Sequence, residues 1–486
     1  MKQFFKQISA LLLSAMLVLS VISLIPAKAD AAAQPKLSKT KLTFASPKAK
    51  AQTITLKNIK ASQIKSVRIN NQYKDQVTVK KISNVKFSVK PKLAGEVTSI
   101  VINVKYKKNI NGMTEGFFYL QNIKVKGHSD IAIKSAAQLM NMRSYTKKYW
   151  TYYLAKDIDL TGKGYVQDKY KNAGYTDFVL DGKGHTIKSD TPIFKSNAGT
   201  IKNIVFDVNM KCQVSKKDAI TKIWGGEPSN STQGGVGPIM DNTYGKVIGC
   251  KSIGKIEIIY DKPVTWTPYG GSASDASPIA EAFVGGLVAF NGYGSIKQCS
   301  SDVKITFKST VDLAPSVYIG GITGRTSNME PYNTGTVTEC VNTGNIQYSS
   351  NSFAYGGGIC GDCHGYITDC LNTGSVKNTG NFQVNGAGIL GTSGGNGKIK
   401  NILNTGDVNA GLYGNQGFGE DPKFTNAYWL SSKSAGFFNV LQQAVEVPGT
   451  KGITDEELTS QATFSGFDFN KIWKMGATGP ELKNVP

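Results

Sequence analysis

The stretch with the clearest potential for chemistry is Cys360-Gly-Asp-Cys363-His364. Its spacing matches the Cys-x-x-Cys-His pattern that attaches c-type haem, and two thiols with an imidazole are also zinc ligands. Structural zinc sites need four ligands, however, and the sequence has no second haem motif. We therefore expect no cofactor and no metal here, and we assign these residues to packing and a turn.

Carboxylates are the second kind of residue that could catalyse a reaction. Cleavage of a glycosidic bond needs two of them, about 5–9.5 Å apart on one face. Asp302, Glu330, Asp362 and Asp369 are available but fall at different positions of a repeat described below. We assign no catalytic residue, and a polysaccharide lyase or glycoside hydrolase remains the alternative function.

Arginine and tyrosine side chains provide a third possibility, which is binding without catalysis. Arg325 and Asp362 each follow a repeat glycine, so we expect them one rung apart. They could form a surface ion pair worth less than about 1 kcal/mol, or part of a glycan-binding row, because a guanidinium fork binds acidic sugars. Tyrosines that could stack on sugar rings stand at glycine-marked corners: Tyr244, Tyr293, Tyr332 and Tyr366.

A repeat positions all of these residues. The pattern Gly-x-Ile/Val-x-x-Cys/Ile begins at Gly199, Gly245, Gly294, Gly335, Gly365 and Gly397, and a Gly-Gly pair precedes most of the later copies. Short strands, glycine corners and a period of roughly 30–50 residues are typical of a solenoid. The sequence therefore predicts an all-β parallel β-helix over residues 128–430.

The register of the repeat predicts columns of identical side chains. Cys250, Cys299, Cys340 and Cys370 share a position with isoleucines, so we expect buried, stacked thiols. Strands in register lie about 4.8 Å apart, farther than the Cβ atoms of a disulfide. Asn342, Asn372 and Asn404 should form an amide ladder. Corner residues with positive φ are expected at Asn203, Gly249, Gln298, Glu339, Asp369 and Asn401.

Residues 431–486 are interpreted as a capping segment. The stretch Thr454-Asp-Glu-Glu457 is a capping box that opens a short helix. Several aromatic residues follow it, which is enough apolar area to close the end of a solenoid: Phe464, Phe467, Phe469 and Trp473.

Positive charge is concentrated before the repeat. Residues 30–127 contain 20 Lys or Arg and 4 acidic residues, whereas residues 128–486 have a net charge of only +3. Apolar residues alternate with polar ones there, which predicts a small antiparallel β-sandwich. The charge indicates either a soluble surface or attachment to an anionic cell-wall polymer. Nucleic acid is not expected as a partner.

Residues 1–29 have the features of a secretory signal peptide. Lys2 and Lys6 precede an apolar stretch, and Ala27-Lys28-Ala29 is a small-residue cleavage site. We expect a secreted protein that does not span a membrane, with non-covalent retention at the cell wall as a further possibility.

The segment from Val284 to Cys299 and its copies resemble the GLUG motif of bacterial surface proteins, and residues 30–127 resemble their immunoglobulin-like modules. The resemblance implies a right-handed parallel β-helix. Such regions occur in adhesins and beside the peptidase domain of some immunoglobulin-A-cleaving enzymes, a domain that this sequence lacks. We therefore expect an adhesion or glycan-binding scaffold whose partner is a glycan or a host or envelope surface component. A purely structural envelope protein remains a third possibility.

Overall fold

The structure is a computed structural model that divides into two compact units, one ending at His128 and the other comprising Ser129–Pro486. It describes residues 33–143, 146–164, 166, 177–215, 233–262, 265–266, 277–278, 281–311, 316–329, 333–380, 386–394, 397–414, 422–434, 437–438, 444–445 and 447–486. The expected signal peptide lies outside these residues. Within them, no helix has the length and apolar character needed to cross a membrane.

The first unit is a sandwich of two four-stranded sheets. One sheet has the order β1 (Lys36–Leu37), β3 (Gln52–Lys57), β6 (Lys86–Pro91) and β5 (Val77–Lys81). The other has the order β2 (Thr43–Phe44), β8 (Met113–Val125), β7 (Gly95–Ile110) and β4 (Ile64–Asn70). All pairings are antiparallel except β2 with β8. A short 3₁₀ helix, η1 (Ala61–Gln63), precedes β4.

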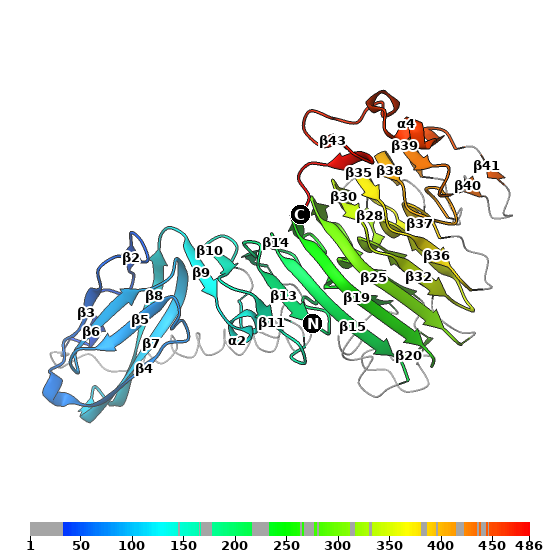
Figure 1. The fold of residues 1–486 in the computed structure, drawn as a ribbon. Coiled ribbons are helices and arrows are strands. Elements are labelled where there is room, and N and C mark those ends of the chain that lie inside the picture. Colours follow the sequence, from blue (N-terminus) through cyan, green and yellow to red (C-terminus); the bar gives the residue numbers. More distant parts are fainter. Residues whose placement is uncertain are drawn as a thin grey trace. The chain divides into compact units, whose positions relative to one another are not determined.

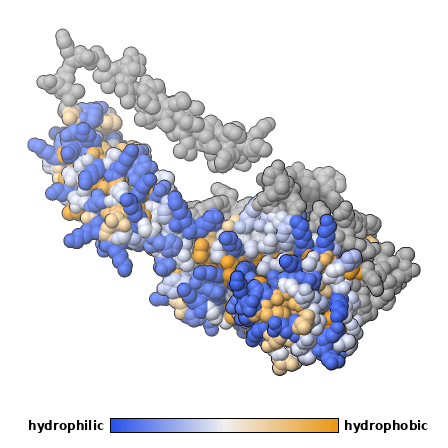
Figure 2. All heavy atoms as spheres, turned by 90° about the horizontal axis from the view of Figure 1, so that it is seen from above, coloured by the Kyte–Doolittle hydropathy of each residue, from blue (hydrophilic) through white to orange (hydrophobic). Residues whose placement is uncertain are grey.

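The core of this unit is apolar. Alternate side chains of each strand point between the sheets, so that Ile54, Phe87, Ile100, Ile102 and Leu120 have no exposed surface. The intervening positions are mostly polar, with lysines among them, and the visible surface of the unit in Figure 2 is mostly hydrophilic with small hydrophobic areas. The period-two pattern of the sequence therefore became two sheets with one buried face each.

The second unit is a parallel β-helix, as the repeat predicted. Its strands stack in parallel along the unit, as the green to orange arrows of Figure 1 show. The largest set of paired strands comprises β9 (Ser129–Ile133), β10 (Trp150–Leu154), β11 (Ile158–Asp159), β12 (Val179–Asp181), β13 (Thr186–Ser189), β14 (Thr200–Lys202), β15 (Val205–Gln213), β18 (Lys246–Ile248), β19 (Lys251–Tyr260), β24 (Ser295–Lys297), β25 (Ser300–Ser309), β30 (Thr336–Thr338), β31 (Val341–Asn342), β32 (Ile346–Ser349), β35 (Tyr366–Asn372), β36 (Val376–Asn378), β38 (Lys398–Asn404), β39 (Lys423–Leu430) and β42 (Thr450–Ile453).

Two smaller parallel sheets come from the Gly-Gly half of the repeat. One contains β16 (Gln233–Val236), β22 (Glu281–Gly285), β26 (Ser316–Gly320) and β33 (Ala354–Gly357). The other contains β17 (Ile239–Asp241), β23 (Val288–Asn291), β27 (Thr323–Thr326), β34 (Cys360–Cys363) and β37 (Leu390–Thr392). The described residues also include the two-stranded pairs β20 (Thr265–Trp266) with β21 (Ser277–Pro278), β28 (Asn328–Met329) with β29 (Asn333–Thr334), β40 (Phe437–Phe438) with β41 (Ala444–Val445), and β43 (Trp473–Gly476) with β44 (Gly479–Leu482).

The corner between the two apolar positions of the repeat has the backbone conformation that the sequence predicted. All six expected residues have a φ between 51° and 59°. Asn426, one rung further on, has a φ of 52°. Glycine, Asn and Asp tolerate this left-handed conformation, which explains Asn203, Gly249, Asp369 and Asn401, while Gln298 and Glu339 adopt it with longer side chains.

The interior of the β-helix contains the predicted cysteine column. Strand register aligns Cys250, Cys299, Cys340 and Cys370 on successive rungs, and each is fully buried and unbridged. Burial raises the pKa of the Cys299 and Cys370 thiols. The column continues into apolar residues, such as Ile402 on the next rung after Cys370.

An amide ladder runs beside this column. The Nδ2 of Asn342 donates to Oδ1 of Asn372 at 2.8 Å, and Nδ2 of Asn372 donates to Oδ1 of Asn404 at 2.7 Å. A Cβ atom on Gly358 would lie only 2.3 Å from Cγ of Asn372. The ladder therefore explains why the Gly-Gly half of the repeat needs glycine, because the asparagine amide occupies the space that a side chain at the glycine position would need.

A second amide ladder was not predicted. Asn197 donates to Asn242, and Asn242 donates to Asn291, each at 2.8 Å. Two of the three asparagines stand three residues before a repeat glycine, Asn242 before Gly245 and Asn291 before Gly294. That spacing was a usable signal for the ladder.

The C-terminal segment packs along the side of the last rungs and not only across their end. Strand β42 pairs with β39 as a final rung, and α4 (Asp455–Leu458) follows, with the expected capping box of Thr454 and Glu457. After η3 (Gln461–Thr463), the aromatic side chains pack on Leu371, Leu403 and other outer residues. The Trp473 indole donates to Asp369 at 3.0 Å, and the Ser300 hydroxyl donates to the carbonyl of Pro486 at 2.6 Å. At the other end, Ser135 caps α2 (Ala136–Met140).

Candidate functional site

Arg325 and Asp362 lie side by side on adjacent strands β27 and β34. Their register places Phe290 and Thr392 in the same column, as the repeat predicted. The Nε of Arg325 is 3.2 Å from Oδ2 of Asp362. The side chain of Asp362 is only 5% exposed and that of Arg325 is 20% exposed, so the pair is partly buried and not a simple surface ion pair.

A second carboxylate and an imidazole join this pair. The Nη1 of Arg325 is 3.2 Å from Oε2 of Glu281 at the start of β22. The Nε2 of His364 is 3.1 Å from Oδ2 of Asp362 and 3.4 Å from Nη2 of Arg325. We call Glu281, Arg325, Asp362 and His364 the ion cluster. Both carboxylates engage the guanidinium. Of the two alternatives for Arg325 and Asp362, this geometry fits an ion pair better than a fork that is open to an acidic sugar.

An aromatic row adjoins the ion cluster. Strand register aligns Phe283, Tyr318 and Tyr355 on β22, β26 and β33, with ring centroids 5.6 and 5.3 Å apart, and Phe353 extends the row at 6.2 Å. The guanidinium of Arg325 lies 5.5 Å from the Phe283 ring. Exposure increases along the row, from 2% for Phe283 to 43% for Phe353. The row therefore rises from the ion cluster to the surface.

The charges of the cluster act on the tyrosine hydroxyl next to it. Burial, followed by the negative charges of Asp362 and Glu281, raises the pKa of Tyr318. The phenol therefore stays protonated and keeps both a donor and an acceptor at neutral pH. Hydroxyl, carboxylate and imidazole groups beside aromatic rings form hydrogen bonds with neutral hydroxyl-rich ligands.

Asp241 lies in the same column as Arg325, two strands away on β17, with Phe290 between them. Burial raises the pKa of its carboxyl to about 6, although hydrogen bonds from Thr243 and Ser196 favour the charged form. A carboxyl that titrates near neutral pH is a common feature of functional sites and also of structural networks. The sequence analysis did not single out this residue.

The predicted tyrosines divide into separate groups. Tyr244 and Tyr293 stand on adjacent rungs with ring centroids 5.4 Å apart. Tyr244 is 56% exposed and has a φ of 65°, a rare conformation for a bulky residue. Tyr366 lies in another column, where its hydroxyl accepts a hydrogen bond from Lys398 at 3.0 Å. Tyr332 lies outside the described residues.

The Cys-x-x-Cys-His stretch forms no metal centre in the described chain. Cys360 and Cys363 are buried, and their thiols point to the carbonyls of Asp362 and Gly365. His364 instead joins the ion cluster. Among the described residues, no group of three or more His, Cys, Asp or Glu is placed to hold a metal ion.

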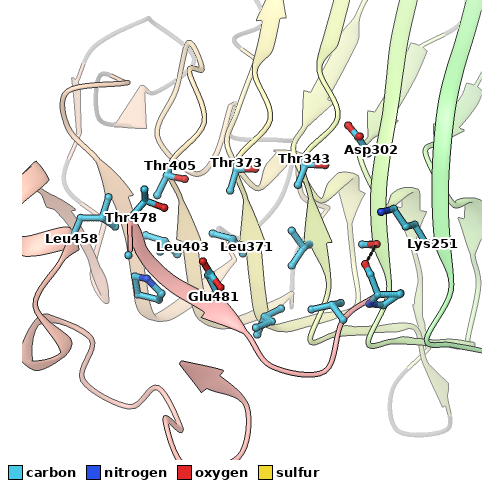
Figure 3. A pocket seen from close by; sticks show the side chains of 17 residues that line it. Lys251, Asp302, Thr343, Leu371, Thr373, Leu403, Thr405, Leu458, Thr478 and Glu481 are labelled. Atoms are coloured by element: carbon cyan, nitrogen blue, oxygen red, sulfur yellow. Dashed lines mark hydrogen bonds between the residues drawn. The ribbon is translucent and has the colours of Figure 1, made fainter. Parts of the chain in front are cut away.

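A groove of about 340 Å³ separates the C-terminal segment from the outer face of the β-helix. Figure 3 shows Thr343, Thr373 and Thr405 in a row on successive strands, with Asp302 at the end of the row. Leu371 and Leu403 form its apolar floor, and Lys251 and Glu481 also line it. Asp302 thus lies in this groove, Asp362 in the ion cluster and Asp369 under Trp473, so the described carboxylates expected for an enzyme do not meet. Glu330 lies outside the described residues.

Glu281, the role of His364 and the aromatic row were not predicted from the sequence. A signal for the row was present, since Phe283, Tyr318 and Tyr355 each stand two residues before a Gly-Gly pair. Glu281 had no such signal because the other copies of the repeat carry no acidic residue at its position.

Comparison with known proteins adds little to the site. No family model matches the chain, and no curated protein does. A crystal structure described as a putative immunoglobulin A1 protease from Bacteroides ovatus is similar over 73% of this chain and 92% of its own, with 17% sequence identity and a TM-score of 0.39. A likeness this distant assigns no activity.

Proposed function

We propose that this protein is an exported scaffold of the bacterial envelope that binds glycan on its β-helix and attaches through its basic sandwich to an anionic polymer. The observation that carries the proposal is the ion cluster beside the aromatic row. These groups come from strands of neighbouring rungs, so their spacing is set by the fold before a ligand arrives. Pre-organised polar groups next to aromatic rings are the usual composition of ligand sites.

Binding is favoured over cleavage by the pairing within the cluster. A glycoside hydrolase needs one carboxyl to donate a proton and another to act as base or nucleophile. Here Glu281 and Asp362 share one guanidinium. Each carboxylate is therefore held in an ion pair with Arg325. These two ion pairs serve to position His364 and the neighbouring rings.

Attachment through the sandwich is supported by its charge. The 20 Lys or Arg against 4 acidic residues in residues 30–127 would attract polyanions, and salt would screen that attraction. The signal-like residues 1–29 support export. The GLUG-like repeat supports a surface location in the same way.

The proposal is tested by offering the full chain a panel of soluble host and cell-wall polysaccharides, with retention and polymer length both recorded. We expect retention without shortening. Tyr355→Ala should weaken binding of the retained polymer roughly fivefold, since loss of one stacking ring costs on the order of 1 kcal/mol. Ile82→Ala, which removes an exposed apolar side chain from the other unit, is the control.

Two outcomes would contradict the proposal. Shortening of any polymer would favour the alternative, a polysaccharide lyase or glycoside hydrolase. Retention that survives unchanged in Tyr355→Ala and in Phe353→Ala would remove the aromatic row from the binding site.

A further inference from the structure

One face of the sandwich carries exposed aromatic rings that the core does not use. Phe117 and Tyr119 on β8 are 53% and 46% exposed, while Leu120 behind them is fully buried. Alternation along the strand turns both rings to the outer face of the sheet β2–β8–β7–β4. An aromatic pair left in water on a soluble unit marks a candidate contact surface.

Strand register places polar and basic side chains, and one valine, beside the two rings. Phe117 lies opposite Asn103 on β7, which lies opposite Arg68 on β4. Tyr119 lies opposite Val101, which lies opposite Asn70. Opposite residues have Cβ atoms about 4.5–5.5 Å apart, so these six side chains form one continuous patch across three strands. We call them the sheet-face patch.

The patch also has an acidic neighbour. Glu115 lies one row further along, opposite Lys105, and accepts a hydrogen bond from Nδ2 of Asn103 at 3.2 Å. Its charge is thus opposed by Lys105 and solvated by Asn103. Arg68 has no acidic residue opposite it in the sheet.

The other sheet of the same unit provides an internal comparison. Its outer positions are small or basic, with Thr53 opposite Ser88 and Ser88 opposite Lys80. It carries positive charge but no aromatic ring at these positions. Two faces of one small unit therefore share their charge and differ in their aromatic content.

We propose that the sheet-face patch is a stacking site for a linear acidic polysaccharide. Flat rings present the apolar area that sugar rings need, amides supply hydrogen bonds to hydroxyls, and the exposed Arg68 neutralises carboxylate groups. Charge complementarity of the unit selects an acidic polymer over a neutral one. This inference rests on the proposed attachment through the sandwich and names the site and the ligand class.

The test compares two polyanions, polygalacturonate, which has sugar rings, and polyglutamate, which has none. For the full chain at moderate salt, we expect the double substitution Phe117→Ala/Tyr119→Ala to weaken polygalacturonate binding roughly tenfold or more. Polyglutamate binding should change less than about twofold, because charge alone holds it. Thr53→Ala/Ser88→Ala on the other sheet is the matched control and should leave both affinities unchanged.

Further arms separate the possible failures. Tyr119→Phe keeps the ring and should therefore keep most of the polygalacturonate affinity, which a misfolded sandwich would lose. Thermal unfolding of the double variant checks that its sandwich is still folded. If the wild-type chain binds neither polymer, the proposed attachment falls together with this inference. If it binds and the double variant binds equally well, only the stacking site falls. Preferential loss of single-stranded DNA binding in the double variant would instead assign the patch to nucleic acid.

Discussion

The two units of this chain use polar side chains in opposite ways. In the sandwich the core is apolar, and most of the polar and basic residues face water. In the β-helix, asparagines are fully buried and bond to one another from rung to rung. Many of its conspicuous polar residues therefore hold the fold together, and only those outside the ladders are candidates for binding.

The contrast follows from strand pairing. Antiparallel strands bury one face and expose the other, which leaves flat sheet faces for ligands. A parallel β-helix aligns the same residue type on successive rungs. The cost of burying an amide is then offset, because the next rung supplies its hydrogen-bond partner. Identical spacing thus marks structure in the β-helix, whereas in the sandwich the exposed aromatic residues are the basis of the proposed binding site.

The largest test of this contrast is Asn372→Ala. The substitution removes bonds to Asn342, Asn404 and the carbonyl of Gly374 in a fully buried position. Unsatisfied buried groups remain on both neighbouring rungs, so we expect a loss of about 3–5 kcal/mol in the free energy of unfolding. Calorimetry should show a lower transition temperature for the β-helix and an unchanged transition for the sandwich, which has its own core.

Asn345→Ala is the matched control for the ladder. Asn345 bonds to Ser375 on the next rung in the same way but at an exposed position. Water replaces the lost partner there, so the cost should stay below about 1 kcal/mol. Equal losses for the two variants would contradict the role assigned to the buried ladder.

A smaller effect is expected from Asp241→Asn, and it should depend on pH. The pKa of this carboxyl is about 6 in the folded chain, against an ordinary value of 3.8. Below about pH 4 it is protonated in both states, whereas above about pH 6 it is ionised in both and folding carries the full cost of burying the charge. Wild-type stability should therefore fall by up to about 3 kcal/mol between these limits.

The neutral asparagine should remove that fall. The variant should match the wild type at pH 4 and exceed it at pH 7, as measured by chemical unfolding at each pH. A difference that is the same at both pH values would show that the substitution acts through lost contacts with Thr243 or Ser196 and not through the buried charge.

Much of the fold could be predicted because equivalent positions of successive repeats are neighbours in a solenoid, so that aligning the repeats gives the strand register. The positive φ at Asn203 and Gln298 and the column that contains Phe290 and Arg325 follow from aligning repeats, without any knowledge of distant contacts. The course of the C-terminal segment could not be predicted in this way. It depends on non-repeated contacts, such as that between Trp473 and Asp369.

The candidate site was harder to predict for the same reason. Arg325 and Asp362 follow from the repeat, but Glu281 reaches them from the neighbouring sheet, and no sequence spacing encodes a contact between sheets. The sequence left both an ion pair and a glycan-binding row open for Arg325, because it does not show that two carboxylates converge on the guanidinium. The exposure of Phe117 and Tyr119 could not be predicted either, since alternation gives the face of the sheet on which a residue lies but not what covers that face.

The smallest expected effect concerns the cysteine column, which only the β-helix has. Cys299 shares its position with Ile204 and Ile402, so Cys299→Val should cost less than about 1.5 kcal/mol, as volume-conserving core substitutions do. Thiol titration of the wild type should find seven reactive groups after denaturation and almost none before, because all seven side chains are buried. A disulfide within the column would instead leave fewer than seven thiols, and Cys299→Val would then cost about 2–4 kcal/mol through loss of the cross-link. That result would make covalent bonds, and not side-chain packing alone, part of what distinguishes the β-helix from the sandwich.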